Sequence, residues 1–193
     1  GFEAYQESLT GELDGAHLIL LAKNFRGYQN LLKLTSEAFD HFYRKPHVTW
    51  AMLEKYHEGV IATSACLGGI IPHALEDGQD DTAEYALKQL LKIFGEDFYL
   101  EIQRHGIRGE SLVNQKLIAL GAKYGIPVIA TTDAHYPTKE DKAAHEIELC
   151  AQTKKTMSEP HFTFEGSGYH LHTSEEMEEL FADIPVALDN TLK

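Results

Sequence analysis

The stretch Pro127-Val-Ile-Ala-Thr-Thr-Asp-Ala-His135 decides the fold class of this chain. An apolar run rich in β-branched residues ends in a polar segment, and Thr138 with Asp141 resembles a capping box that opens a helix to about Cys150. The same order of apolar run, polar break and amphipathic helix occurs three more times, with runs at residues 17–22, 60–65 and 98–102. Such alternation predicts an α/β fold with a parallel sheet or an α/β barrel.

Caps and breaks predict the remaining segments. Ser111 is expected to cap the helix after the third run, and Gly125 to end it. Residues 152–172 are irregular and polar, so we expect a long loop that leads to a short strand near Tyr169. An acidic helix capped by Thr173 or Ser174 is predicted to follow.

Composition limits the classes of function. The 193 residues suffice for one domain or a large part of one, and they start at Gly1 without an initiator Met, so we expect a fragment of a longer protein. The sequence contains no apolar run long enough to span a bilayer and no secretory signal, and its two cysteines suit a reducing compartment, so a cytoplasmic location is expected. A net charge of -13 makes the chain a poor stand-alone binder of nucleic acid, unless bound cations reverse the local field.

Four residues with metal-binding side chains follow predicted strands. Functional side chains of α/β barrels sit at the carboxyl ends of strands, and this rule selects Cys66, His105, Asp133 and His135. Thiolate, imidazole and carboxylate are ligands of zinc and manganese. The alternative is structural: Asp133 caps a turn, His135 packs beside Tyr136, and Cys66 is a small buried residue.

A second candidate pattern, His170-Leu-His172, has a strong metal-ligand spacing. It lies after the barrel-like units and directly before the acidic helix. We therefore interpret it as an exposed strand that leads into a helix cap. The sequence contains no Walker-type phosphate loop, no Gly-x-Gly-x-x-Gly motif and no Gly-x-Ser-x-Gly motif.

Ordered segments along nearly the whole chain resemble a known family. They include Ser64-Ala-Cys-Leu-Gly-Gly69, Phe98-Tyr-Leu-Glu-Ile-Gln-Arg-His-Gly106, Ile129-Ala-Thr-Thr-Asp-Ala-His-Tyr136 and Ser174-Glu-Glu-Met-Glu-Glu-Leu-Phe181, with further matches at 17–24 and 27–34. Together they are similar to the PHP (polymerase and histidinol phosphatase) domain of bacterial DNA polymerase III alpha subunits. The resemblance implies a partial, distorted (β/α)7-type barrel over residues 1–150. It also implies that residues 151–193 form the end of the domain, leading toward a polymerase core.

The resemblance also implies a set of site residues. Family metal ligands fall on Glu3, His17, Cys66, Asp133 and His135, of which Asp133 and His135 are the catalytic candidates. His105 is expected beside the site, as a residue that orients its neighbours. The ions would be Mn²⁺ or Zn²⁺, with Mg²⁺ as a further alternative. The family's first His-x-His motif is absent from residues 1–16, so the chain is expected to begin partway through the domain.

The implied function has two levels. The parent protein would be a DNA-directed DNA polymerase, and this domain a metal-dependent phosphoesterase with 3′-5′ proofreading exonuclease activity in its complete form. Expected partners are the 3′ end of a primer strand, the rest of the alpha subunit, a separate proofreading subunit and a sliding clamp, with no membrane. The alternative is a metal-stabilised structural or docking domain without nuclease activity. A free-standing enzyme similar to histidinol phosphatase is disfavoured by the segments at 17–34 and 174–191.

Overall fold

The chain folds around one mixed sheet. The computed structural model describes residues 2–7, 13–43 and 45–193, and within them seven strands pair in the order β3-β4-β1-β2-β5-β6-β7. Their bounds are β1 Phe2–Glu7, β2 Leu13–Ala22, β3 Phe42–Tyr43, β4 Lys45–Val48, β5 Val60–Thr63, β6 Phe98–Ile102 and β7 Val128–Ala130.

The pairing directions confirm an α/β fold and correct one prediction. β5, β6 and β7 are parallel neighbours, as the repeated strand–helix units predict. A wholly parallel sheet is wrong, because β2 runs antiparallel to both β1 and β5, and β3 runs antiparallel to β4. The sequence analysis also missed β1, β3 and β4. No strand pair joins β7 to β3 in the described ranges, so a closed barrel stays a prediction.

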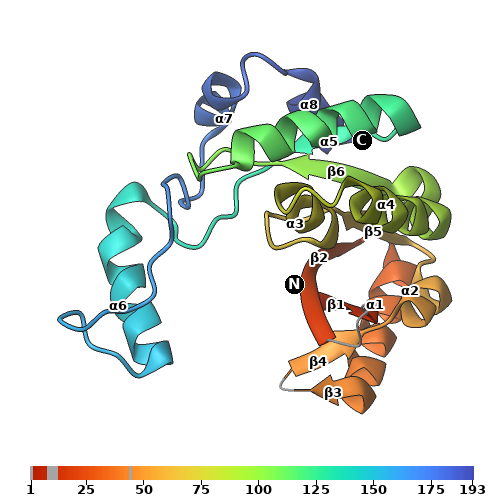
Figure 1. Ribbon diagram of the computed structural model, residues 1–193, viewed down its shortest axis with the longest axis horizontal. Helices are drawn as coiled ribbons and strands as arrows, with labels where there is room; N and C mark the ends of the chain where they lie inside the picture. Colours follow the sequence, from red (N-terminus) through yellow and green to blue (C-terminus); the bar gives the residue numbers. More distant parts are fainter. Residues whose placement is uncertain (1, 8–12, 44) are drawn as a thin grey trace.

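Helices follow most strands and cover the sheet (Figure 1). Their bounds are α1 Phe25–Ala38, α2 Trp50–Tyr56, α3 Ile70–Glu76, α4 Asp80–Phe94, α5 Glu110–Tyr124, α6 Lys142–Thr153, α7 Ser174–Leu180 and α8 Val186–Asp189. Figure 1 shows α6 standing apart from the sheet, whereas α7 and α8 lie beside α5. This arrangement leaves the chain between β7 and α7 as an arm next to the carboxyl edge of the strands.

The helix ends test the predicted caps. The capping box of Thr138 and Asp141 is confirmed, although it opens a short 3-10 turn (Lys139–Asp141) directly before α6. Thr173 caps α7 as predicted and forms a capping box with Glu176. The prediction for Ser111 is wrong. Helix α5 begins two residues earlier than predicted, because its cap is Gly109, whose φ of 88° lies in a region that glycine adopts without a steric penalty.

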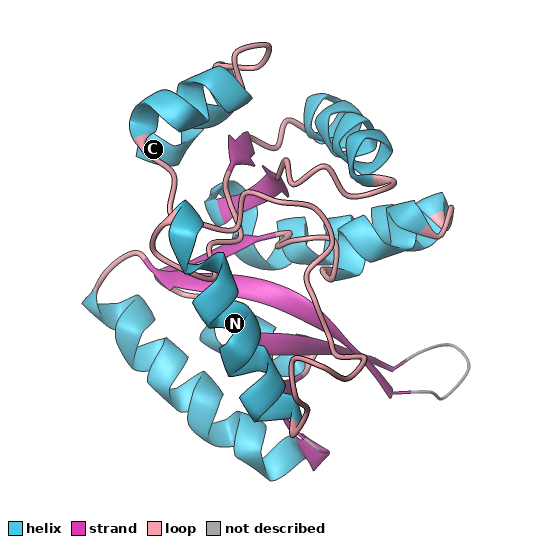
Figure 2. Ribbon diagram, turned by 90° about the vertical axis from the view of Figure 1, so that its left-hand side faces the viewer, coloured by secondary structure: helices cyan, strands magenta, loops and turns pink. Residues whose placement is uncertain are grey.

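The hydrophobic core joins the sheet to the C-terminal segment. Phe98 and Leu100 of β6 are fully buried, as are Leu87 of α4 and Phe181 directly after α7. Figure 2 shows in a second view that helices surround the strands of the sheet. Burying one such side chain stabilises the fold by roughly 2–3 kcal/mol. The outer edge of β7 is also covered, because the Asn190 side chain donates a hydrogen bond of 2.8 Å to the Val128 carbonyl. The core therefore fixes the strand ends that carry the candidate site.

Among the described residues, the structure contains no helix that is both long and apolar enough to cross a membrane.

Candidate metal centre

Four of the predicted site residues follow strands that end at one edge of the sheet. β5, β6 and β7 are parallel, so their carboxyl ends share an edge. Cys66 follows β5, His105 follows β6, and Asp133 and His135 follow β7. The side chains selected by the strand-end rule therefore lie at a common edge, and their roles stay a prediction.

His17 reaches the same edge by another route. It lies in the first half of β2, and the antiparallel register pairs Ile19 with Thr63, near the end of β5. His17 consequently lies beside the turn that follows β5, and its Nδ1 is 3.5 Å from the Cys66 sulfur. The strand-end rule could not find His17, because in an antiparallel strand the early residues lie at this edge. Only the family resemblance indicated it.

The turn that carries Cys66 is tightly built. Ala65 has a φ of 61°, which is uncommon for a residue other than glycine and costs about 1 kcal/mol or more. The Gly69 amide donates to the Cys66 carbonyl at 2.8 Å, and a side chain at Gly69 would lie 2.0 Å from the Ser64 carbonyl. A Cβ at Gly68 would lie 3.1 Å from the His17 Nδ1. Glycines at both positions thus allow Cys66 and His17 to approach each other.

Asp133 and His135 form the second pair. The His135 Nε2 lies 3.4 Å from an Asp133 oxygen, and the two side chains are 32% and 40% exposed respectively. The His135 amide donates to the Tyr169 carbonyl at 2.7 Å, and the His135 ring lies 4.4 Å from the Phe164 ring, measured between centroids. The pair is therefore held by the 163–172 segment yet stays accessible to a ligand.

His105 is buried and strongly oriented. The Glu110 carboxylate lies 3.1 Å from the His105 Nδ1 and accepts hydrogen bonds from the His105 and Gly106 amides at 2.8 and 3.0 Å. The His105 ring stacks on the Tyr169 ring with centroids 4.3 Å apart, and Tyr169 contacts His135 edge to face at 5.8 Å. His105 thus supports the neighbourhood of His135 through Tyr169. These contacts agree with the predicted orienting role, which stays a prediction.

A buried carboxylate beneath the edge was missed by the sequence analysis. Glu101 of β6 is 4% exposed, and its carboxylate accepts hydrogen bonds from Thr63 at 2.5 Å, from Gln103 at 2.9 Å and from Thr131. These donors come from the ends of all three parallel strands, so the network ties the strand ends together. The available signal was a single acidic residue inside the otherwise apolar run Phe98-Tyr-Leu-Glu-Ile102.

The charges at the edge affect two neighbouring groups. Burial raises the pKa of the Cys66 thiol, and the negative charges of Asp133 and Glu101 raise it further. Burial, followed by the charges of Glu110, Asp133 and Cys66, raises the pKa of Tyr169 to about 12. The field at this edge is therefore negative, which is the environment that a divalent cation stabilises.

For Glu3 the structure describes the backbone. The strand register pairs Glu3 of β1 with His17 of β2 and with His47 of β4, but the Glu3 side chain lies outside the described part of the structure. Among the described residues, no three His, Cys, Asp or Glu side chains are close enough to hold one metal ion. The donors are instead present as two pairs, His17 with Cys66 and Asp133 with His135.

Comparisons with known proteins identify the family. Residues 1–105 match the PHP domain. The chain belongs to the PHP domain family. The matched residues include the positions of Glu3, His17, Cys66 and His105, and they end before Asp133 and His135.

Several polymerase subunits contain a similar PHP segment. The chain is 44% identical over 179 residues to DNA polymerase III subunit alpha of Borreliella burgdorferi, covering 92% of the chain and 16% of that protein. It is 44% identical over 169 residues to the subunit of Thermus aquaticus, covering 86% and 14%, and 39% identical over 180 residues to that of Treponema pallidum, covering 92% and 15%. The chain therefore spans about a sixth of the length of these relatives.

The His170-Leu-His172 motif of this PHP domain departs from its prediction. His170 is 6% exposed and forms a parallel bridge with Tyr136, so the expected exposed strand is wrong at this position. The His170 and His172 rings stack with centroids 4.0 Å apart. Hydrogen bonding to the chain after β7 buries His170, an arrangement that the local sequence does not indicate.

Proposed function

We propose that this PHP domain hydrolyses phosphodiester bonds in a metal-dependent reaction, and that in its complete form it trims the 3′ end of DNA as a 3′-5′ exonuclease. One observation supports this most directly. Two pairs of metal-binding side chains, His17–Cys66 and Asp133–His135, occur at the same edge of the sheet. Two or more divalent ions bound among such donors are a common arrangement for phosphoryl transfer.

The donor chemistry fits a Mn²⁺ or Zn²⁺ centre, with Mg²⁺ as an alternative. His17, Cys66, Asp133 and His135 would hold the ions, with Glu3 as a fifth ligand, and they supply nitrogen, sulfur and oxygen donors. Gly68 lies close to His17 and has no side chain, so the space beside the His17 imidazole stays open for an ion. A Cβ at Gly68 would narrow that space. A bound divalent cation would supply a Lewis acid that lowers the pKa of a water ligand to about 7.

The protein residues would have distinct roles. Asp133 and His135 are the proposed catalytic residues, because they are partly exposed at the edge and can contact both an ion and a substrate phosphate. Cys66 would bind as a thiolate, since a cation offsets the burial and the negative charges that raise its pKa. His105 and Glu110 would keep Tyr169 and His135 in register without touching the substrate.

The relatives supply the wider proposal. Proteins called DNA polymerase III subunit alpha contain similar segments, so we propose that the chain belongs to a cytoplasmic DNA-directed DNA polymerase. Its partners would then be the primer 3′ end, the remainder of that subunit, a proofreading subunit and a sliding clamp. Residues 1–150 would form most of a distorted (β/α)7 barrel, and residues 151–193 would lead toward the polymerase core.

A second candidate is a metal-stabilised structural or docking domain. The donors occur as separate pairs rather than as one cluster in the described residues, and bound ions can stabilise a fold without turnover. Metal content alone cannot separate the two candidates, because both predict bound ions.

The experiment compares the Asp133→Asn variant with the unaltered protein in a polypeptide of the relatives' full length. Bound metals are measured by mass spectrometry, and trimming of a 3′-labelled DNA strand and primer extension are measured on the same samples. We expect trimming to fall at least about 100-fold while primer extension stays within about two-fold. Full metal content with trimming that does not depend on Asp133 would contradict the exonuclease proposal and favour the structural role.

A further inference from the structure

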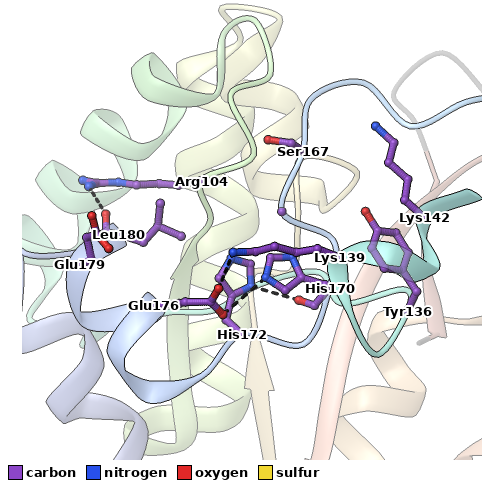
Figure 3. Close-up of a pocket in the computed structure, with 11 residues that line it drawn as sticks. Arg104, Tyr136, Lys139, Lys142, Ser167, His170, His172, Glu176, Glu179 and Leu180 are labelled. Carbon is purple, nitrogen blue, oxygen red and sulfur yellow. Dashed lines mark hydrogen bonds and ion pairs between the residues drawn. The ribbon is translucent and has the colours of Figure 1, made fainter.

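A second concave region lies beside the candidate metal centre. It is a cavity of about 610 Å³ whose walls come from the chain after β7, the start of α6, the 167–172 segment and α7 (Figure 3). Tyr136 and Lys142 line one side of it, Ser167 lies across from them, and His170, His172 and Glu176 line the rest (Figure 3). None of these six residues is among the proposed metal ligands.

The cationic side chains around this cavity differ in whether they form ion pairs. Lys139 pairs with Glu176 at 2.5 Å, and Arg104 pairs with Asp183 at 2.7 Å. Lys142, in contrast, forms no ion pair or hydrogen bond with any residue in the described ranges. The same holds for the Tyr136 and Ser167 hydroxyls. Figure 3 shows Lys142 and Tyr136 extending from neighbouring elements, whereas the Ser167 hydroxyl points away from both.

His170 provides a second, independent indication of a ligand. Its side chain is 8% exposed and lines the cavity, yet its Nε2 makes no hydrogen bond within the described structure. The nearest acidic oxygen belongs to Glu176 at 3.5 Å, and that oxygen already accepts the Thr173 amide at 3.0 Å. A buried polar nitrogen without a hydrogen bond is energetically unfavourable, and a bound oxygen that accepts from it would offset this cost.

The cavity is coupled to the candidate metal centre through the backbone. Tyr136 directly follows His135, and the pair Tyr136–His170 is a parallel bridge supported by a 3.1 Å hydrogen bond from the Leu171 amide to the Tyr136 carbonyl. Neighbouring side chains of extended backbone point to opposite sides. Tyr136 and His170 therefore face the cavity, whereas His135 and Tyr169 contact each other on the other side.

We propose that this cavity binds a backbone phosphate of single-stranded DNA, next to the nucleotide whose phosphodiester reaches the metal centre. The phosphate would accept hydrogen bonds from Lys142 and Tyr136, and its strand would pass along His170. An ammonium group and a hydroxyl match the acceptor oxygens of a phosphodiester and carry no sequence information. This inference rests on the proposed function, because it names the substrate subsite of that reaction.

The test measures binding apart from turnover. A fluorescein-labelled oligothymidylate is titrated with the full chain in the presence of EDTA, and binding is followed by fluorescence anisotropy at several salt concentrations. Lys142→Ala is expected to weaken binding roughly ten-fold and to reduce the salt slope by about 0.7. Lys33→Ala, which removes the same charge from the exposed face of α1, should change binding less than two-fold.

A third variant is expected to change the affinity for the oligothymidylate in the opposite direction. Glu176→Gln releases Lys139 and removes a negative charge from the cavity wall, while glutamine can still complete the capping box with Thr173. We expect several-fold tighter binding of the oligothymidylate. Equal weakening by Lys142→Ala and Lys33→Ala, or no effect of Lys142→Ala, would overturn the proposal.

The outcome is separable from that of the proposed function. Lys142-dependent binding together with a failure of Asp133-dependent trimming would retain the DNA subsite and reject the nuclease. Asp133-dependent trimming whose KM is unchanged by Lys142→Ala would retain the nuclease and reject the subsite.

Discussion

Two carboxylates at neighbouring strand ends have opposite environments. Glu101 of β6 is 4% exposed and accepts hydrogen bonds from side chains of three strand ends. The Asp133 side chain, after β7, is 40% exposed and has His135 at 3.4 Å as its ion-pair partner. A saturated, buried carboxylate holds the strand ends together, whereas an open one remains available to a cation or substrate. The edge thus has a structural layer around Glu101, and we propose that the residues around Asp133 form a reactive layer.

The largest expected difference is in stability. Glu101→Ala should lower the free energy of unfolding by about 3 kcal/mol, because it leaves Thr63, Gln103 and Thr131 without their shared acceptor and opens a cavity. Asp133→Ala should change it by less than about 0.5 kcal/mol. Urea unfolding of both variants measures this contrast. Equal losses would show that the two-layer comparison is wrong.

The second expected effect concerns Glu110, which belongs to the structural layer. Glu110→Gln keeps the size of the side chain but removes the charge that accepts the His105 and Gly106 amides. A loss of about 1.5 kcal/mol is expected from weakened charge-assisted hydrogen bonds. Thermal and urea unfolding measure the loss, with the exposed Glu148→Gln in α6 as control. A variant as stable as the control would place Glu110 outside this layer.

The third expected effect concerns the reactive layer. Gly68→Ala brings a Cβ to 3.1 Å from the His17 Nδ1, so the imidazole must shift by a few tenths of an ångström. Affinity for Mn²⁺ or Zn²⁺ should fall roughly ten-fold, while unfolding free energy changes by less than about 1 kcal/mol. Isothermal titration with each metal checks this. Unaltered affinity would argue that His17 is not a ligand.

The smallest expected effect is a pH dependence of stability that comes from Glu84, where α4 contacts α5. Lys123, Tyr124 and Lys88 lower the pKa of Glu84 to about 2, so this carboxyl is more acidic in the folded chain than its ordinary value of 4.5. A depressed pKa contributes stability above about pH 4.5 that is lost as the pH falls toward 2. At higher pH the Glu84→Gln variant should melt at a lower temperature than the unaltered chain. This difference in melting temperature should shrink as the pH falls from about 4.5 toward 2. A constant gap between the two curves would contradict the assignment.

The sequence predicted the positions of the candidate site residues better than the hydrogen-bond network around Glu101. Strand periodicity and the strand-end rule placed Cys66, Asp133 and His135 at one edge, because parallel strands bring their carboxyl ends together. The rule missed His17, since strand direction in the sheet depends on pairing that the local pattern does not encode. The local sequence did not indicate Glu101, because two of its hydrogen-bond partners, Thr63 and Thr131, lie 38 and 30 residues away in the sequence.

We propose that the His17–Cys66 and Asp133–His135 pairs hold one metal centre. Substitution with Co²⁺ tests this arrangement, because a cobalt–thiolate bond gives a charge-transfer absorption that reports on Cys66 alone. If the pairs share a centre, Cys66→Ser abolishes this absorption, and Asp133→Asn weakens the binding of the same cobalt ion at least about ten-fold. A charge-transfer titration that is identical in the unaltered chain and in Asp133→Asn would contradict it, because the two pairs would then belong to separate sites.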